Sequence, residues 1–140
     1  MYLLEAASKI MRCRAFVHEV SAVIAAEYFN EESGGTRKAF ALVTAGPGLT
    51  NAITGIAGAW LENRGVLILG GQVKTEDLKG PEMRQRGIQE IDGVDLVSSI
   101  TKTAIRLDRP HPRSEIVKAV RRAFEGRPGP VFIEVCIDIS

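Results

Sequence analysis

The sequence predicts an α/β fold in which helices flank a doubly wound, mostly parallel sheet. Three short apolar runs rich in β-branched residues, at 40–43, 66–69 and 131–135, are typical of strands that are covered on both faces. Segments with helical periodicity lie between these runs, and turn-forming stretches such as 126–130 separate them. Because strands and helices alternate, we expect the three runs to be neighbouring, parallel, central strands.

The N-terminal part of the chain predicts a helix over 1–9, because Leu3, Leu4 and Ala7 fall on one side of it. This helix leads into residues 15–17, which are a weaker strand candidate. A wound α/β domain usually opens with a strand, and none precedes the predicted helix. We therefore expect the fold to lack its first strand.

Three further segments, 21–29, 49–61 and 115–124, have the spacing of amphipathic helices. Residues 100–103 are a second weaker strand candidate. The side chains expected to face inward from the three helices are Ala22, Ala25, Ala26 and Phe29, then Ile53, Ile56, Ala57 and Trp60, and finally Ile116, Val117, Val120 and Phe124.

Length and composition limit the class of protein. The 140 residues predict a single domain over 1–140, and 45% hydrophobic with 25% charged residues excludes a disordered tail or a coiled coil. A net charge of +1 gives no sign of nucleic-acid binding or of a polybasic membrane surface. The longest apolar runs are far shorter than a membrane span, and residues 1–10 carry Glu5 but no basic residue before their apolar residues, so we do not expect them to be a secretion signal. We expect a cytoplasmic protein without nucleic-acid or membrane partners.

The two cysteines, Cys13 and Cys136, do not have the spacing of metal ligands. We expect both to be small, buried hydrophobic residues in a reducing compartment. No metal site is expected within the chain.

The segment 44–51, Thr-Ala-Gly-Pro-Gly-Leu-Thr-Asn, connects a predicted strand to a predicted helix. It therefore lies at the carboxyl edge of the sheet, where open α/β folds bind ligands. Its two glycines let the backbone turn sharply and approach a ligand. Pro47 between them excludes a GxGxxG dinucleotide fingerprint, and the chain has no Gly-Lys-Ser/Thr of a Walker loop. On the pattern alone, a tight turn without a ligand is equally compatible.

Two other junctions place polar residues at the same edge. His18 and Glu19 lie where 15–17 would pass into the next helix, and 70–72 (Gly-Gly-Gln) ends another predicted strand. A glutamate at a helix start usually compensates the helix dipole at the surface. A glutamate in an apolar site would instead have a raised pKa and could share a proton. The pattern leaves both interpretations open for Glu19.

His18-Glu19 before an Ala-rich helix, followed by Val43 and the 44–51 segment, resembles the pyrimidine-binding N-terminal domain of thiamine-diphosphate enzymes of the acetolactate synthase type. The resemblance runs from about Leu3 to the C-terminus with the motifs in the family's order. Each motif is weak alone, whereas five in order are specific. The further matching segments are 52–57, 71–73, 88–90 (Ile-Gln-Glu), 100–102 and 127–131.

The resemblance implies a thiamine-diphosphate-dependent enzyme that decarboxylates or carboligates 2-oxo acids. In this family the glutamate of the His-Glu pair hydrogen-bonds N1′ of the cofactor's aminopyrimidine, and Glu19 matches it as a catalytic residue. A carboxyl that shares a proton with N1′ helps to remove the thiazolium C2 proton, and such a relay needs a raised carboxyl pKa. Thr44, Pro47 and Asn51 match positions that line the pyrimidine pocket.

Two glutamines and three basic residues complete the expected site. Gln89 matches a catalytic glutamine that faces cofactor and substrate, and Gln72 matches a cofactor-side glutamine. Lys102 matches a basic position near the active-site entrance, although a solvated lysine fits at least as well. Arg84 and Arg86 lie between the two glutamines, in a stretch longer than we expect in acetolactate synthases, which puts acetolactate itself in doubt as the product. They would hold a substrate carboxylate or phosphate, with a solvated charged loop as the alternative.

Enzymes of this family bind the diphosphate and Mg²⁺ with a second domain that carries a Gly-Asp-Gly motif, and this chain has no Gly-Asp-Gly. The resemblance therefore implies an N-terminally truncated pyrimidine-binding domain. Its partner would be a diphosphate-binding domain or subunit in a homo- or hetero-oligomer. The alternative is a catalytically inactive interaction subunit that keeps the dimer surface. A third interpretation, an unrelated nucleotide-binding α/β domain, explains only the turns.

Overall fold

The computed structural model describes residues 2–139, and its elements confirm the predicted α/β alternation. Two short 3-10 turns, η1 (Thr75–Asp77) and η2 (Ser98–Ile100), flank the long connection after the second strand. The helices are α1 (Tyr2–Ile10), α2 (Glu19–Glu32), α3 (Pro47–Leu61), α4 (Gly93–Val97) and α5 (Arg113–Arg122), and the strands are β1 (Phe40–Val43), β2 (Val66–Gln72), β3 (Thr103–Leu107) and β4 (Pro130–Cys136).

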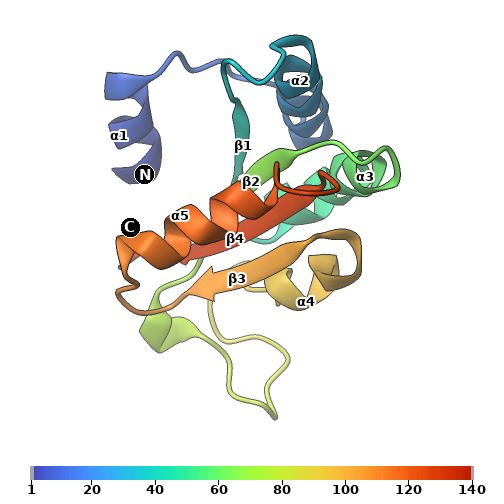
Figure 1. The fold of residues 1–140 in the computed structure, drawn as a ribbon. Coiled ribbons are helices and arrows are strands. Elements are labelled where there is room, and N and C mark those ends of the chain that lie inside the picture. The colour runs from blue at the N-terminus through green and yellow to red at the C-terminus, as the bar shows by residue number, and fades with distance from the viewer. Residues whose placement is uncertain (1, 140) are drawn as a thin grey trace.

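The four strands form one parallel sheet in the order β1-β2-β4-β3 (Figure 1). Leu42 is in register with Leu69, and Leu69 with Ile133. The three strongest strand predictions are thus confirmed as parallel neighbours. The prediction that all three are central was wrong for β1, because β1 is an edge strand of the described sheet.

Helices cover both faces of the sheet, as a doubly wound fold requires. On one face, α2, α3 and α4 pack over a core that includes Val23, Ile56 and Phe132. On the other face, α5 packs over Ile133, and Figure 1 shows it running along β4. Leu3 of α1 packs against the same core. With both faces covered, the strand ends are the part of the sheet that is open to a ligand.

Asn30 ties three parts of the chain together inside the protein. Its side-chain Nδ2 donates hydrogen bonds to the carbonyl oxygens of Ala39, at 3.1 Å, and Gly65, at 2.9 Å. The backbone N–H of Ala39 donates back to Oδ1 of Asn30 at 2.6 Å. The Asn30 side chain is buried, and these part-buried bonds satisfy the backbone groups of the two strand starts. The end of α2, the start of β1 and the start of β2 are therefore fixed as one unit.

The buried faces of the helices differ from the predicted faces at a few positions. In α2 the buried residues include Val23 and Asn30, whereas Phe29 is 41% exposed. The hydrogen bonds of Asn30 hold its side chain in the interior. The side chain of Phe29, the preceding residue in the helix, therefore lies at the surface. Trp60 near the end of α3 and Val117 in α5 are also more than a third exposed, although both were expected to face inward.

Both weaker strand predictions need correction. Residues 15–17 are an exposed, irregular connection in which no backbone pairs with the edge of β1. A strand needs a neighbouring strand to pair with its backbone N–H and C=O groups. Residues 15–17 have no such neighbour, so their backbone groups are left to water. The strand expected at 100–103 begins only at Thr103, because Ile100 belongs to η2 and the Thr101 hydroxyl donates to the carbonyl of Val97.

The two cysteines lie in different environments. Cys136 at the end of β4 is fully buried, as expected, but Cys13 lies exposed in the connection between α1 and α2. The expectation that both are buried was therefore wrong for Cys13. No helix among residues 2–139 is long and apolar enough to cross a membrane.

Candidate functional site at the carboxyl edge of the sheet

Glu19 is the first residue of α2. The helix starts there because His18 is extended, with φ −131°, and its Nδ1 accepts a hydrogen bond from the backbone N–H of Val20 at 3.4 Å. Glu19 is half-buried at the surface. Its carboxylate lies at the positive end of the α2 dipole, which favours the charged form.

The turn between β1 and α3 has no room for side chains at two glycines. Gly46 has φ +59°, and a Cβ built there would lie 2.3 Å from the carbonyl oxygen of Gln89. A Cβ on Gly48 would lie 2.3 Å from Thr44 Oγ1 and 3.5 Å from Glu19 Oε1. The bare backbone of this turn therefore touches both the α2 start and the loop that carries Gln89. Pro47 occupies the first turn of α3, where its missing N–H leaves no unmet hydrogen bond.

A hydrogen bond joins the starts of α2 and α3. The Nδ2 of Asn51 donates to Glu19 Oε2 at 3.1 Å, although the two residues are separated by 32 positions in the sequence. Together with the contacts of Gly48, this bond brings Glu19, Thr44 and Asn51 into one group. The group lies at the carboxyl end of β1.

The two glutamines lie at the same edge but differ in their surroundings. Gln72, at the end of β2, is only 4% exposed. Its Nε2 donates to the carbonyl of Ile91 at 2.8 Å and its Oε1 accepts from the N–H of Val73 at 2.8 Å, so its polar atoms hold a loop. Gln89 is exposed, with φ +58° and its carbonyl oxygen against Gly46. Of the two side chains, that of Gln89 is the one that faces solvent.

The three basic candidates are not together. Arg84 and Arg86 are exposed on the loop that precedes Gln89. Lys102 lies at the opposite, amino edge of the sheet, where its backbone N–H donates to Pro130 O at the start of β4 and its Nζ donates to Glu125 O at 2.6 Å. In this chain Lys102 does not join the expected site, because it precedes β3 at the amino edge whereas the glycine turn lies at the carboxyl edge.

The protonation of Glu19 also differs from the expectation. A hydrogen bond from its own backbone N–H, together with the Asn51 amide, holds the pKa of the Glu19 carboxyl below its usual value. The relay that the resemblance implies needs a raised pKa, whereas the lowered pKa agrees with the other interpretation that the pattern left open, a charge at a helix start. Glu19 is therefore a carboxylate at neutral pH, ready to accept a hydrogen bond.

The residues at this edge fit an aminopyrimidine. Both glycines of the turn pack against the chain itself, at Thr44 and Gln89, so the group that this edge offers to a ring is the half-buried Glu19 carboxylate. Asn51 holds one oxygen of that carboxylate, which leaves Oε1 on the side of Gly48. A protonated ring nitrogen placed against Glu19 would donate a hydrogen bond to this carboxylate. Among residues 2–139 no three His, Cys, Asp or Glu side chains are grouped so that they could hold a metal ion.

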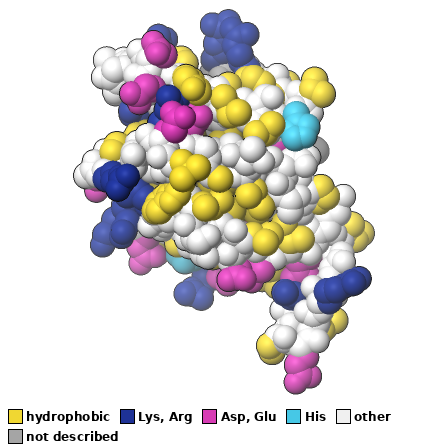
Figure 2. Space-filling model, turned by 90° about the vertical axis from the view of Figure 1, so that its right-hand side faces the viewer, with side chains coloured by type: hydrophobic (Ala, Val, Ile, Leu, Met, Phe, Trp, Pro, Cys, Tyr) yellow, Lys and Arg dark blue, Asp and Glu magenta, His cyan; other side chains and the backbone are white. Residues whose placement is uncertain are grey.

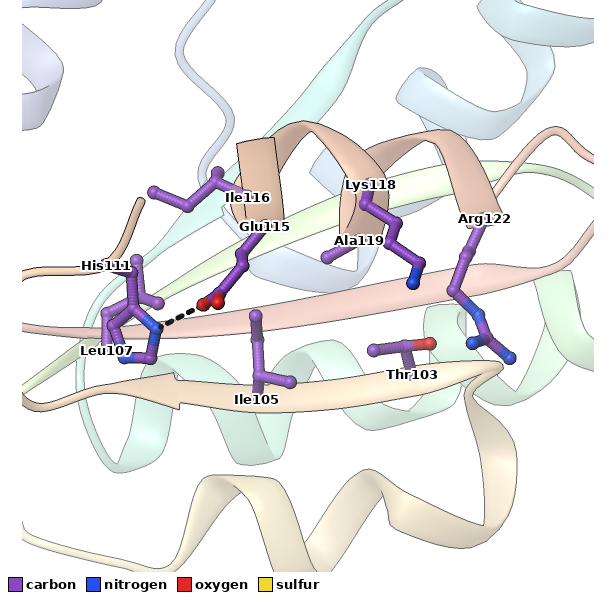
Figure 3. A pocket seen from close by; sticks show the side chains of 9 residues that line it. All are labelled: Thr103, Ile105, Leu107, His111, Glu115, Ile116, Lys118, Ala119 and Arg122. Carbon is purple, nitrogen blue, oxygen red and sulfur yellow. Dashed lines mark hydrogen bonds and ion pairs between the residues drawn. The ribbon is translucent and has the colours of Figure 1, made fainter. Parts of the chain in front are cut away.

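A separate cleft of about 260 Å³ lies between β3 and α5 (Figure 3). Its lining is mostly apolar, with Ile105 and Leu107 on one wall and Ile116 on the other. The Nδ1 of His111 lies 3.3 Å from Glu115 Oε2 at one end. None of the expected site residues lines this cleft, so the cleft does not belong to the site at the glycine turn.

The sequence prediction missed two buried carboxylates near the site. Glu90 accepts three backbone hydrogen bonds from its own loop. Glu134 in β4 is 1% exposed and accepts a hydrogen bond from Arg106 Nε at 2.5 Å, while Arg106 also donates to Asp92 at the start of α4. An acidic residue inside the apolar run 131–135 was the available signal for Glu134.

Comparisons with known proteins identify the family of the chain. A family described as "Thiamine pyrophosphate enzyme, N-terminal TPP binding domain" matches residues 1–96. The chain belongs to this family, which confirms the resemblance drawn from the motifs. Membership implies thiamine diphosphate as the cofactor.

Three relatives illustrate the range of the family. The catabolic acetolactate synthase of Raoultella terrigena is 36% identical over 138 residues, 98% of this chain and 23% of that protein. The acetolactate synthase large subunit of Lactococcus lactis is 39% identical over 126 residues, 88% of this chain and 20% of that protein. Human 2-hydroxyacyl-CoA lyase 2 is 35% identical over 124 residues, 87% of this chain and 18% of that protein. The chain spans about a fifth of the length of the curated relatives it matches.

Proposed function

We propose that this chain binds the aminopyrimidine of thiamine diphosphate, with Glu19 as the activating acid–base group, in an enzyme that decarboxylates or carboligates 2-oxo acids. The observation that carries the proposal is the hydrogen bond between Asn51 and Glu19 beside the glycine turn. Two helix starts that are distant in sequence meet there around a single carboxylate. The relatives named acetolactate synthase support the substrate class.

Each residue at this edge has a distinct part in the proposal. Glu19 accepts or shares a proton at N1′ of the pyrimidine ring, and Asn51 fixes the orientation of its carboxylate. Thr44 and Pro47 line the ring, and the exposed side chain of Gln89 faces cofactor and substrate. When bound, thiamine diphosphate supplies the electron sink for the carbanion formed from the substrate.

The proposal also requires a second domain or subunit. A lowered pKa keeps Glu19 ionised in this chain, whereas covering the carboxylate with apolar surface raises its pKa towards the range in which it exchanges protons. Figure 2 shows hydrophobic side chains gathered on the face that lies over α2, α3 and α4, a surface suited to such a partner. We propose that this partner, in a homo- or hetero-oligomer, also holds the diphosphate and Mg²⁺. The exposed large apolar residues of these helices include Ile24, Tyr28, Leu61 and Leu96.

A second candidate is a lyase that cleaves a 2-hydroxyacyl-CoA. The human relative of that name is about as similar to this chain as the acetolactate synthases are. Arg84 and Arg86 are exposed near Gln89, and in either enzyme we propose that they hold a substrate carboxylate or phosphate. The substrate that is turned over decides between the two candidates.

A chimera tests the proposal, with this chain in place of the matched segment of the Raoultella terrigena protein. The loaded chimera should exchange the C2 proton of thiamine diphosphate for deuterium, as followed by NMR. Glu19→Gln should slow this exchange about 10²- to 10⁴-fold, because an amide neither takes up nor releases a proton as a carboxyl group does. Glu31→Gln, an exposed change at the other end of α2, is the matched control and should leave the rate unchanged.

Two results would contradict the proposal. Undiminished exchange in the Glu19→Gln chimera would mean that Glu19 is only a charge at a helix start. A folded, loaded chimera without any exchange would favour the inactive interaction subunit. Turnover of pyruvate against turnover of a 2-hydroxyacyl-CoA separates the two substrate classes.

A further inference from the structure

The loop over 79–91 is irregular and yet closely held. It runs between η1 and α4, carries Arg84 and Arg86 outward and brings Gln89 to the glycine turn. An irregular segment of this length loses much conformational entropy when it is ordered. Specific contacts must therefore fix it.

Glu90 supplies the central contact. Its Oε1 accepts a hydrogen bond from the backbone N–H of Lys79 at 2.6 Å, and its Oε2 accepts from Arg86 at 2.8 Å and Gly87 at 3.0 Å. Glu90 is 6% exposed, so water does not compete for these bonds. Hydrogen bonds to a buried carboxylate are among the stronger ones in proteins. One side chain thus closes the loop from Lys79 to Glu90 into a ring.

Two further contacts press this ring onto the sheet edge. Gln72 at the end of β2 donates to the carbonyl of Ile91, next to Glu90. A Cβ built on Gly87 would lie 2.6 Å from Val73 Cγ1, so the loop backbone packs directly on the chain that follows β2. Held at both places, the chain passes through Gln89 at φ +58°.

We infer that Glu90 is a positioning residue whose carboxylate ties the 79–91 loop into a ring and thereby sets Gln89 against the Gly46 turn. The role of Gln89 towards cofactor and substrate rests on the proposed function, whereas the tie itself does not. A glutamine at position 90 has one acceptor oxygen and turns an NH₂ group towards N–H donors. Lys79 is the charged neighbour that acts on this carboxylate.

The tie has a spectroscopic signature in the full chain. The ¹⁵N–H signals of Lys79, Arg86 and Gly87 should titrate together as the pH falls, with a common midpoint below the usual glutamate pKa of about 4.3. The direction follows because the three N–H donors, which outweigh burial, lower the pKa of Glu90. Separate midpoints, or no titration of the three amides, would overturn the inference even if no variant folds.

Two variants sharpen the test. Glu90→Gln should abolish the common titration and speed trypsin cleavage after Arg84 and Arg86 about tenfold or more, because the loop opens locally. Cleavage after Arg122 in α5 is the internal control. Glu82→Gln, an exposed change in the same loop, should change neither readout. Unchanged cleavage and titration in a folded Glu90→Gln protein would show that other contacts hold the loop.

A double-mutant cycle in the active chimera tests whether Glu90 acts through Gln89. Glu90→Gln should lower kcat/KM in the parent and have little further effect in a Gln89→Ala background. Additive losses would overturn the positioning role. The NMR and trypsin readouts contain no cofactor, so failure of the proposed function would leave the tie intact and is distinguishable from failure of the tie.

Discussion

Gly46 is the residue on which the site geometry depends most. Gly46→Ala adds a Cβ at a positive φ against the backbone carbonyl of Gln89, which cannot rotate away. We expect a loss of about 2–4 kcal/mol in the free energy of unfolding, measured with urea. Gly80→Ala, in the loop and with open space around it, should change stability by less than about 0.5 kcal/mol.

Asn30 offers a second prediction at the residue scale. Asn30→Ala removes three hydrogen bonds and leaves the part-buried backbone groups of Ala39 and Gly65 without this partner. The free energy of unfolding should fall by about 2–4 kcal/mol. An unchanged urea midpoint would mean that water replaces the side chain, and the joint between α2, β1 and β2 would then not depend on Asn30.

The site residues show what sequence alone can predict about a site. Glu19 and Asn51 were placed at strand-to-helix junctions, and such junctions share one edge of a parallel sheet. The pKa of Glu19 is lowered first by its own backbone N–H and then by the Asn51 amide, and the second contribution depends on how two helix starts meet in space, which the order of residues does not reveal. The three donors to Glu90 come from a loop without periodicity. Lys102 was assigned to the site from the resemblance alone, and the structure places it before β3, at the amino edge of the sheet.

At the scale of elements, two glycines in α3 predict opposite outcomes. A Cβ on Gly55 would lie 2.8 Å from Val23 Cβ of α2, so Gly55→Ala should push the helices apart and cost about 1–3 kcal/mol. Gly58, one turn further along, has open space, and Gly58→Ala should stabilise the helix by about 0.5–1 kcal/mol. Thermal unfolding of both variants measures the difference. Equal shifts would mean that α2 and α3 do not pack as described.

The ion pair between β3 and β4 predicts a dependence on pH. Burial raises the pKa of Glu134, and Arg106 opposes this rise. Arg106→Met removes the opposing charge and should cost about 3–5 kcal/mol at pH 7. Because the folded pKa then lies further above the unfolded value, the variant should be more stable at pH 5 than at pH 8.

Urea unfolding at both pH values measures this effect. Adding Glu134→Leu to Arg106→Met should restore most of the stability and remove the pH dependence. A single variant that is equally stable at pH 5 and pH 8 would mean that Glu134 stays charged without its partner.

Strands were predictable from the sequence where their burial on both faces produced a continuous run of apolar residues. The runs that became β2 and β4 are covered on both faces, so their apolar residues are continuous. β3 is half-buried along most of its length as an edge strand, and its sequence gives only a weak signal. Residues 15–17 have strand-like composition without a sheet partner, and composition alone does not reveal whether a partner exists.

At the scale of the whole molecule, the open site predicts an inactive isolated chain. Thr44, Asn51 and Gln89 are exposed, and Glu19 is only half-buried, so water reaches the reacting groups. The chain alone should not turn over pyruvate and should bind thiamine diphosphate weakly, as measured by calorimetry. Robust turnover by the isolated chain would show that the diphosphate and metal need no second domain.

The difference in exposure between Cys13 and Cys136 makes it possible to follow the binding of a partner with a fluorescent label. Burial raises the pKa of Cys136 to about 11, and only thiolates react readily with maleimides. The Cys136 thiol is therefore both inaccessible and protonated at neutral pH, and it should not be labelled. Cys13 is open to solvent between α1 and α2. A fluorophore should therefore attach at this one position in the unmodified protein. Its emission and anisotropy would then report docking of a partner close to the start of α2, without any engineered label.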